Sequence, residues 1–292
     1  MKSRLSLLAV VAGTALAAQA RVNGALRTRI GDALVTALVS FTVGTVVLVV
    51  AAVATGRARN AARLRSGTRW WWWLGGLAGA LLVGSSAAAV PEVGVALTSV
   101  AIVAGATIGS LVVDLTGISP RGRQPLTAPR VAGSALAVAG LVVGSFGTDG
   151  EVRPLLLAVV GVAGFCSAFQ QAANGHLQRH TGEALVAASV SFLTGTVALA
   201  LVTLATRPGL APWPHSPWLY AGGLGGAAYV ALGAYTVPKI GVLRLTLGTV
   251  AGQVAGAVVL DAVVPTPSGL AGASVVAALL TMGAVVVANR GR

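Results

Sequence analysis

An internal duplication is the feature that most constrains this chain. Residues 19–45 align with residues 170–196 at an offset of 151, and about half of the aligned positions are identical. After a loop shortened by four residues the offset becomes 147, and the match continues. The matching stretches are Q…NG.L (19–26 with 170–177), SF..GT (40–45 with 191–196), GGLAGA with GGLGGA (75–80 with 222–227) and PEVGV with PKIGV (91–95 with 238–242). We therefore expect two copies of one structural unit, residues 1–148 and 149–292.

The first twenty residues allow two interpretations. MKSRLSLLAVVAGTALAAQA has a basic start, an apolar centre and an A-x-A arrangement, which together are typical of a cleavable signal peptide. Its copy, PLLLAVVGVAGFCSAFQQAANG, lies in the middle of the chain and is long enough to be a membrane helix. The duplication favours the second interpretation, in which the N-terminal run is a retained first helix.

Composition indicates an all-α integral membrane protein. Apolar residues make up 55% of the chain, charged residues only 9%, and the mean hydropathy is +0.86, whereas a soluble domain carries about 25% charged residues. Runs long enough to cross the hydrocarbon core lie at 5–22, 32–54, 70–90, 92–113, 130–147, 154–172, 183–205, 217–237, 240–262 and 269–289. Ten runs form two sets of five, and because five is odd the copies must enter the membrane from opposite sides. Inverted repeats of this kind are typical of secondary transporters, whose substrate site lies where the halves meet.

The net charge of +13 comes from basic residues whose distribution fits a membrane topology rather than a nucleic-acid-binding surface. With the N-terminus inside, fourteen of the twenty basic residues fall on the cytoplasmic side and five on the other, while Arg244 lies within the membrane. The positive-inside rule then places both termini in the cytoplasm. Four tryptophans at 70–73 follow the basic loop and are expected to anchor the chain at that interface. A stacking platform for a ligand is the alternative for these tryptophans.

These motifs, in this order, resemble the YdcZ family of the drug/metabolite transporter superfamily, in a fused two-copy form. The resemblance covers essentially the whole chain and rests on the duplicated Q…NG…L with SF..GT, the WW..LGG..GA stretch, the VP.(hydrophobic)GV turn and the G(Q)…D segment. It implies an EamA-like secondary transporter of the bacterial inner membrane, with many relatives acting as exporters and no cargo named. It also implies a cavity lined by the first, third, fourth, sixth, eighth and ninth helices. The chain departs from the family pattern at Ala106, where the second copy has Gln253.

Polar residues within the apolar runs are the candidates for substrate binding. Gln19 and Asn23, like Gln170 and Asn174, are four residues apart, so each pair lies on one helix face. Unpaired amides are costly in lipid, so these side chains and Gln253 are expected either to bind a polar substrate or to bond between helices. A third interpretation of the N-G pairs is a turn that ends the helix near the membrane surface.

Four charged residues are candidates for coupling or for charge pairs. Glu92 and Lys239 follow matching prolines, and each is expected to begin a helix; an acid in the first turn suits the helix dipole, and a base does not. For Glu92 the functional alternative is a proton-coupling carboxylate. Arg244 is an intramembrane cation that either snorkels to the cytoplasmic interface or pairs with Asp114, for which Lys239 is the other possible partner.

Other chemistries find little support in the sequence. Cys166 is the only cysteine, His176 and His180 lack a clear third metal ligand, and no P-loop is present. We expect no metal, cofactor or enzymatic activity, and lipid and a small molecule as partners of a monomer or homodimer. The first hypothesis is an ion- or proton-coupled exporter that works by alternating access. A non-transporting membrane receptor or assembly subunit is the alternative.

Overall fold

The structure, a computed structural model, describes residues 2–125, 127–146, 154–206 and 213–263, together with residues 276, 279, 280 and 283. Every regular element within these ranges is helical. The α-helices are α1 (Lys2–Ile30), α2 (Ala33–Ala54), α3 (Gly75–Thr116), α4 (Ala128–Phe146), α5 (Pro154–Thr181), α6 (Ala184–Thr206), α7 (Gly222–Ile240) and α8 (Val242–Val263). Three short 3₁₀ helices are η1 (Arg57–Arg65), η2 (Trp70–Leu74) and η3 (Pro217–Tyr220).

Seven helical segments of the described chain are long and apolar enough to cross a membrane. They are Arg4–Ile30, Ala33–Ala54, Trp70–Val95, Leu97–Thr116, Pro154–Thr181, Ala184–Thr206 and Val242–Leu260. The runs predicted at 130–147 and 217–237 form α4 and α7, which are helical but not among the seven. The run predicted at 269–289 lies mostly outside the described residues. The prediction of an all-helical membrane protein is confirmed.

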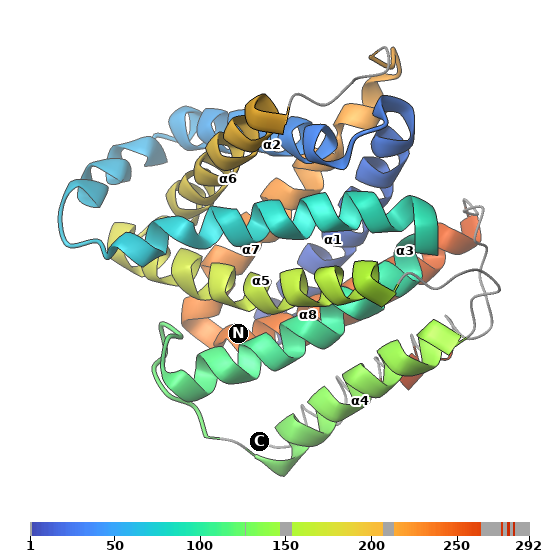
Figure 1. Ribbon diagram of the computed structural model, residues 1–292. Coiled ribbons are helices and arrows are strands. Elements are labelled where there is room, and N and C mark those ends of the chain that lie inside the picture. The colour runs from blue at the N-terminus through green and yellow to red at the C-terminus, as the bar shows by residue number, and fades with distance from the viewer. Residues whose placement is uncertain are drawn as a thin grey trace.

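The helices pack mainly between the two copies rather than within each copy. α3 lies along α5, and α1 lies along α8 and α7, while α2 and α6 contact one another on one side of this group. α4 lies at the edge of the bundle and packs along α3 (Figure 1). The site described below therefore lies between elements that come from both halves of the sequence.

The helices α1 and α5 are longer than predicted. Asn23-Gly24 and Asn174-Gly175 lie inside these helices, which end only before Gly31 and Gly182. Both terminal glycines have positive φ, 85° and 79°, a conformation that favours glycine at a helix end. The interpretation of the N-G pairs as turns that end the helix is therefore wrong, and the four amides belong to the packed interior.

A glycine, not a proline, separates the third and fourth predicted helices. Helical structure continues through Pro91, and the break comes at Gly94, with φ 79° and ψ 167°. Its counterpart Gly241 has φ 85° and ψ 166° between α7 and α8. These dihedrals are essentially restricted to glycine, so both copies break at the same aligned position.

This break corrects the prediction that Glu92 and Lys239 begin helices. Glu92 lies within α3, before the break at Gly94, and Lys239 lies in the last turn of α7. A cation near a helix C-terminus is stabilised by the helix dipole and an anion is not. Lys239 therefore suits its position, and Glu92 is the residue whose charge is unfavourably placed.

Small residues let the central helices approach backbone to backbone. A Cβ added at Gly105 or Gly109 of α3 would overlap the backbone of Gly161 or Phe165 on α5. In the other copy, a Cβ at Gly252 would overlap the carbonyl group of Val10 on α1. The spacing of four residues between Gly105 and Gly109 thus serves close packing of the helices.

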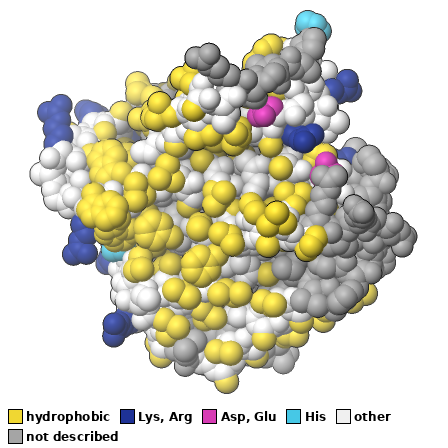
Figure 2. Space-filling view, in the orientation of Figure 1, with side chains coloured by type: hydrophobic (Ala, Val, Ile, Leu, Met, Phe, Trp, Pro, Cys, Tyr) yellow, Lys and Arg dark blue, Asp and Glu magenta, His cyan; other side chains and the backbone are white. Residues whose placement is uncertain are grey.

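The face drawn in Figure 2 is largely hydrophobic between edges where Lys and Arg side chains gather. Exposed apolar side chains include Val46, Val50 and Val53 on α2, and Leu201 and Leu204 on α6. Such a surface is typical of helices that face lipid, where exposed apolar residues carry no cost.

Candidate functional site

A small cavity lies where the two copies meet. Its wall is formed by Leu16, Gln19, Phe41, Gly79, Leu82, Val83, Gln170, Phe192, Gly226, Tyr229 and Val230. The cavity volume, taken as the space that the centre of a water-sized sphere can reach, is about 10 Å³. This is roughly the volume that one water molecule needs. In this conformation the cavity has no room for a larger ligand.

Serine hydroxyls hold the amide side chains at this cavity. The Ser40 Oγ accepts from Asn23 Nδ2 at 3.2 Å and from Gln19 Nε2 at 3.5 Å. In the second copy, Ser191 Oγ accepts from Gln170 Nε2 at 3.2 Å. The four amides are between 0% and 3% exposed, so each copy buries the same polar group between its first two helices.

Several amide oxygens have no hydrogen-bond partner within the described chain. Gln19 Oε1, Asn23 Oδ1, Gln170 Oε1 and Asn174 Oδ1 are all buried and unbonded there. A buried polar atom left without a partner costs about 1–3 kcal/mol. Gln19 and Gln170 place two of these acceptors in one cavity wall, where they suit a ligand with hydrogen-bond donors.

Glycines of the opposite copy make room for these amides. A Cβ at Gly222 would overlap Asn23 Oδ1, and one at Gly226 would lie within 2.8 Å of the Gln19 amide. In the other copy, a Cβ at Gly79 would lie 2.5 Å from Gln170 Nε2. The absence of a side chain at these glycines therefore leaves room for the amides.

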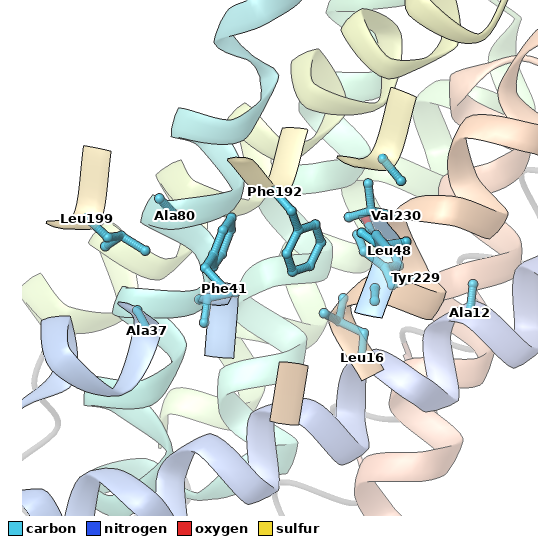
Figure 3. Close-up of a cluster of buried hydrophobic side chains, with 13 residues drawn as sticks. Ala12, Leu16, Ala37, Phe41, Leu48, Ala80, Phe192, Leu199, Tyr229 and Val230 are labelled. Carbon is cyan, nitrogen blue, oxygen red and sulfur yellow. The ribbon is translucent and has the colours of Figure 1, made fainter. Parts of the chain in front are cut away.

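A stacked pair of phenylalanines borders the cavity between α2 and α6 (Figure 3). The ring centroids of Phe41 and Phe192 are 4.7 Å apart with an interplanar angle of 26°. Each ring fills the space beside a glycine of the other helix, Phe41 beside Gly195 and Phe192 beside Gly44. Near this pair Thr45 Oγ1 and Thr196 Oγ1 lie 2.9 Å apart. These contacts are reciprocal between the two copies. The second and seventh predicted helices, α2 and α6, therefore line the cavity together with the first and sixth, α1 and α5.

The lining differs from the one that the family resemblance implied. The fourth and ninth helices, residues 97–116 of α3 and α8, contribute no residue to this cavity as far as the structure describes it. Gln253 on α8 is 3% exposed but lies elsewhere, with its backbone nitrogen 2.7 Å from the Cβ position of Gly13. Gln253 is thus not brought together with the four amides.

The charged candidates lie away from the cavity wall. Glu92 and Arg244 are exposed, and Asp114 is 2% exposed at the end of α3. Asp114 and Arg244 adjoin one apolar cluster that contains Val113 and Leu245. Lys239 Nζ lies 2.7 Å from the centroid of the Tyr235 ring, a cation–π arrangement.

The tryptophans pack on the end of α5. Trp72 stacks on His176 with centroids 5.2 Å apart and an angle of 10°, and Trp71 meets the same ring edge-on at 5.2 Å. His180 Nε2 lies 2.9 Å from the Arg63 carbonyl oxygen. The histidines thus contact tryptophans and backbone, and no group of three potential metal ligands occurs in the described residues.

The sequence contained signals for the residues that it did not assign. Ser40 and Phe41, with Ser191 and Phe192, belong to the SF..GT motif that revealed the duplication, yet the motif alone does not say what they touch. Tyr229 could have been found by comparing copies, because Leu82 stands at its aligned position.

The all-helical fold and the long apolar helices define a multi-pass helical membrane protein. The chain belongs to the family described as "Putative inner membrane exporter, YdcZ", whose model matches residues 5–143 and 155–287. This is a transporter family of the inner membrane, not an enzyme family. A solved structure titled "Crystal structure of protein" has the same fold, with 23% identity, a TM-score of 0.67, and coverage of 98% of this chain and 96% of that one. No curated protein matches this chain.

Proposed function

We propose that this protein is a secondary active transporter that exports a small molecule by alternating access. The observation that carries the proposal is the pair of unbonded amide oxygens, those of Gln19 and Gln170, that the two copies contribute to the wall of a small cavity at their junction. A static partner or receptor has no need for such acceptors in lipid, where each is costly. A transporter needs them because a polar substrate loses its hydrogen bonds to water when it enters the site, and hydrogen bonds to protein groups must replace them.

The proposed mechanism rests on two inverted repeats, residues 1–148 and 149–292. Gln19 and Gln170 are each eleven residues before the end of their helix, α1 ending at Ile30 and α5 at Thr181. If these helices run in opposite directions, both amides fall near the middle of the membrane, where transporter sites lie. The cross-copy contacts then allow one half to rock against the other around the amides.

The contacts of basic residues support cytoplasmic termini. Arg63 Nη1 donates to the Thr181 carbonyl oxygen at 2.8 Å, and Arg121 Nη1 donates to that of Lys239 at 3.2 Å. Arg179 bonds the Pro120 carbonyl oxygen. The loops that the positive-inside rule assigns to the cytoplasm thus contact one another, as they must if they share one side.

The test is transport by purified protein in proteoliposomes, with a panel of cationic, neutral and anionic metabolites and with or without a pH gradient. Gln170→Leu removes one acceptor and should lower the rate about tenfold or more, as expected for losing a hydrogen bond worth about 1.4 kcal/mol. Gln178→Leu is the matched control, because Gln178 lies two turns further along α5 and outside the cavity wall. Equal transport rates for the two variants would mean that the amides do not contact the substrate during transport.

We further propose Glu92 as a candidate for proton coupling. A substrate-dependent current that requires the pH gradient and is lost in Glu92→Gln would establish the role. Silence across the panel, from folded and inserted protein, would move weight to the receptor alternative.

Asp114 and Arg244 are proposed to form a charge pair at the cytoplasmic end. Removing one partner of a buried pair is strongly destabilising, by about 3–5 kcal/mol, because it leaves an uncompensated charge; since Arg244 is exposed, a smaller cost is expected here. Asp114→Arg and Arg244→Asp should each reduce the level of inserted protein, and the double exchange should restore it. Immunoblots of membrane fractions give the measurement, and no recovery in the double variant would dismiss the pair.

A further inference from the structure

The cavity wall consists almost entirely of matched positions from the two copies. Aligned by the offsets of 151 and 147, the wall contains five pairs. They are Gln19 with Gln170, Phe41 with Phe192, Gly79 with Gly226, Leu82 with Tyr229 and Val83 with Val230. The cavity therefore lies on the pseudo-twofold axis of the duplication, and any chemical difference between its two sides is specific to this chain.

One pair breaks the symmetry, and its neighbours break it in the same direction. Tyr229 lines the cavity where the first copy has Leu82, and Gln171 and Ser167 lie beside its hydroxyl, outside the wall. The positions aligned with Gln171 and Ser167 are Ala20 and Leu16. The second copy thus places a hydroxyl, with polar neighbours, where the first copy has aliphatic side chains.

Further hydrogen-bonding capacity is buried beside Tyr229 and in the wall itself. Gln171 is 2% exposed, and its amide lies in the space beside Gly233, where a Cβ would overlap Oε1. In the wall, Gln19 and Gln170 each carry an amide oxygen that has no hydrogen-bond partner in the described chain. These two oxygens, one from each copy, can accept hydrogen bonds, and the Tyr229 hydroxyl can both donate and accept them.

The charge of the wall limits the ligand as much as its polarity does. None of the eleven residues described as lining the cavity is ionisable at neutral pH. A full charge buried there would lack a counter-charge, which is expensive in a membrane interior. The rings of Phe41, Phe192 and Tyr229 instead offer apolar faces to the body of a ligand.

We propose that the cavity takes a small uncharged amphiphile, with its donor-bearing polar group toward the Tyr229 hydroxyl and its apolar body toward Leu82. The proposal rests on the transport function proposed above and names its substrate class. Because the cavity has room for about one water molecule, the ligand enters when the copies separate.

Four probes with one ring and different heads test this class. They are benzyl alcohol, toluene, benzylammonium and benzoate, and their dissociation constants are measured by titration calorimetry on the purified full chain in detergent. Benzyl alcohol should bind about tenfold or more tightly than each of the other three. Tyr229→Phe should remove that advantage and leave toluene unchanged. Tyr220→Phe is the control, because the Tyr220 hydroxyl bonds the Pro214 carbonyl oxygen at 2.7 Å and lies outside the cavity wall.

Three results would overturn the proposal: binding of none of the probes, tighter binding of a charged probe, or an unchanged benzyl alcohol affinity in Tyr229→Phe with the fold retained. Binding is measured without a membrane gradient, so it is separate from transport. Selective binding without uptake of benzyl alcohol into proteoliposomes would contradict the transport function and leave the ligand class standing. Uptake of other cargo, with no selectivity for benzyl alcohol, would do the reverse.

Discussion

Phe41→Ala should lower the free energy of unfolding by about 3–5 kcal/mol, the usual cost of removing a fully buried phenylalanine ring. The ring is 1% exposed and stacks on Phe192 at the junction of α2 and α6. It also fills the space beside Gly195, where a Cβ would overlap it. Since these helices belong to different copies, the cavity left by alanine would loosen their contact, and Phe192→Ala should have a similar effect.

The measurement is the midpoint of unfolding of purified protein in detergent, by heat and by titration with a denaturing detergent. Phe165→Ala is the matched control, because that ring is 39% exposed and its loss should cost about 1 kcal/mol or less. If Phe41→Ala unfolds no earlier than Phe165→Ala, the stacked pair does not hold α2 against α6.

The sequence predicted the helices better than it predicted their ends. Length and apolar runs decide that a segment is helical in lipid, since backbone groups must bond within the segment. Where a helix stops depends on single residues, and the two strongest local signals misled. Asn23-Gly24 reads as a turn but lies within α1, and the Asn23 amide bonds Ser40 on the next helix. Pro91 reads as a break, yet the break falls at Gly94, whose dihedrals need glycine.

The site was only partly accessible to sequence reasoning, for a similar reason. Amides stand out in an apolar run, so Gln19, Asn23, Gln170 and Asn174 could be singled out, and the structure places Gln19 and Gln170 in one cavity wall. Gln253 has the same signal and is buried without reaching the cavity. Periodicity gives the face of a helix but not its neighbour, so the partners of these amides, Ser40 and Ser191, needed the packed fold.

Gly105→Ala should reduce the amount of folded protein sharply, at a cost at or above the upper end of the roughly 1–3 kcal/mol typical of overpacking. The new Cβ would overlap the carbonyl oxygen of Gly161, and backbone on both sides cannot turn aside as a flexible side chain can. α3 and α5 would have to separate along their whole contact, which joins the two copies.

Gly84→Ala on the same helix provides the control. Its Cβ would meet only the Cβ of Ala37, at 3.9 Å, and a glycine replaced by alanine within a helix should gain about 0.4–1 kcal/mol. The two substitutions are chemically identical and should move the midpoint of thermal unfolding in opposite directions. A second pair on α5 repeats the test from the other side, because a Cβ at Gly164 would overlap the Ile102 carbonyl oxygen and one at Gly161 would lie 3.8 Å from that of Ala101. Equal midpoints within both pairs would mean that α3 and α5 do not approach so closely in the membrane, and the cavity at the junction of the copies would then have a different wall.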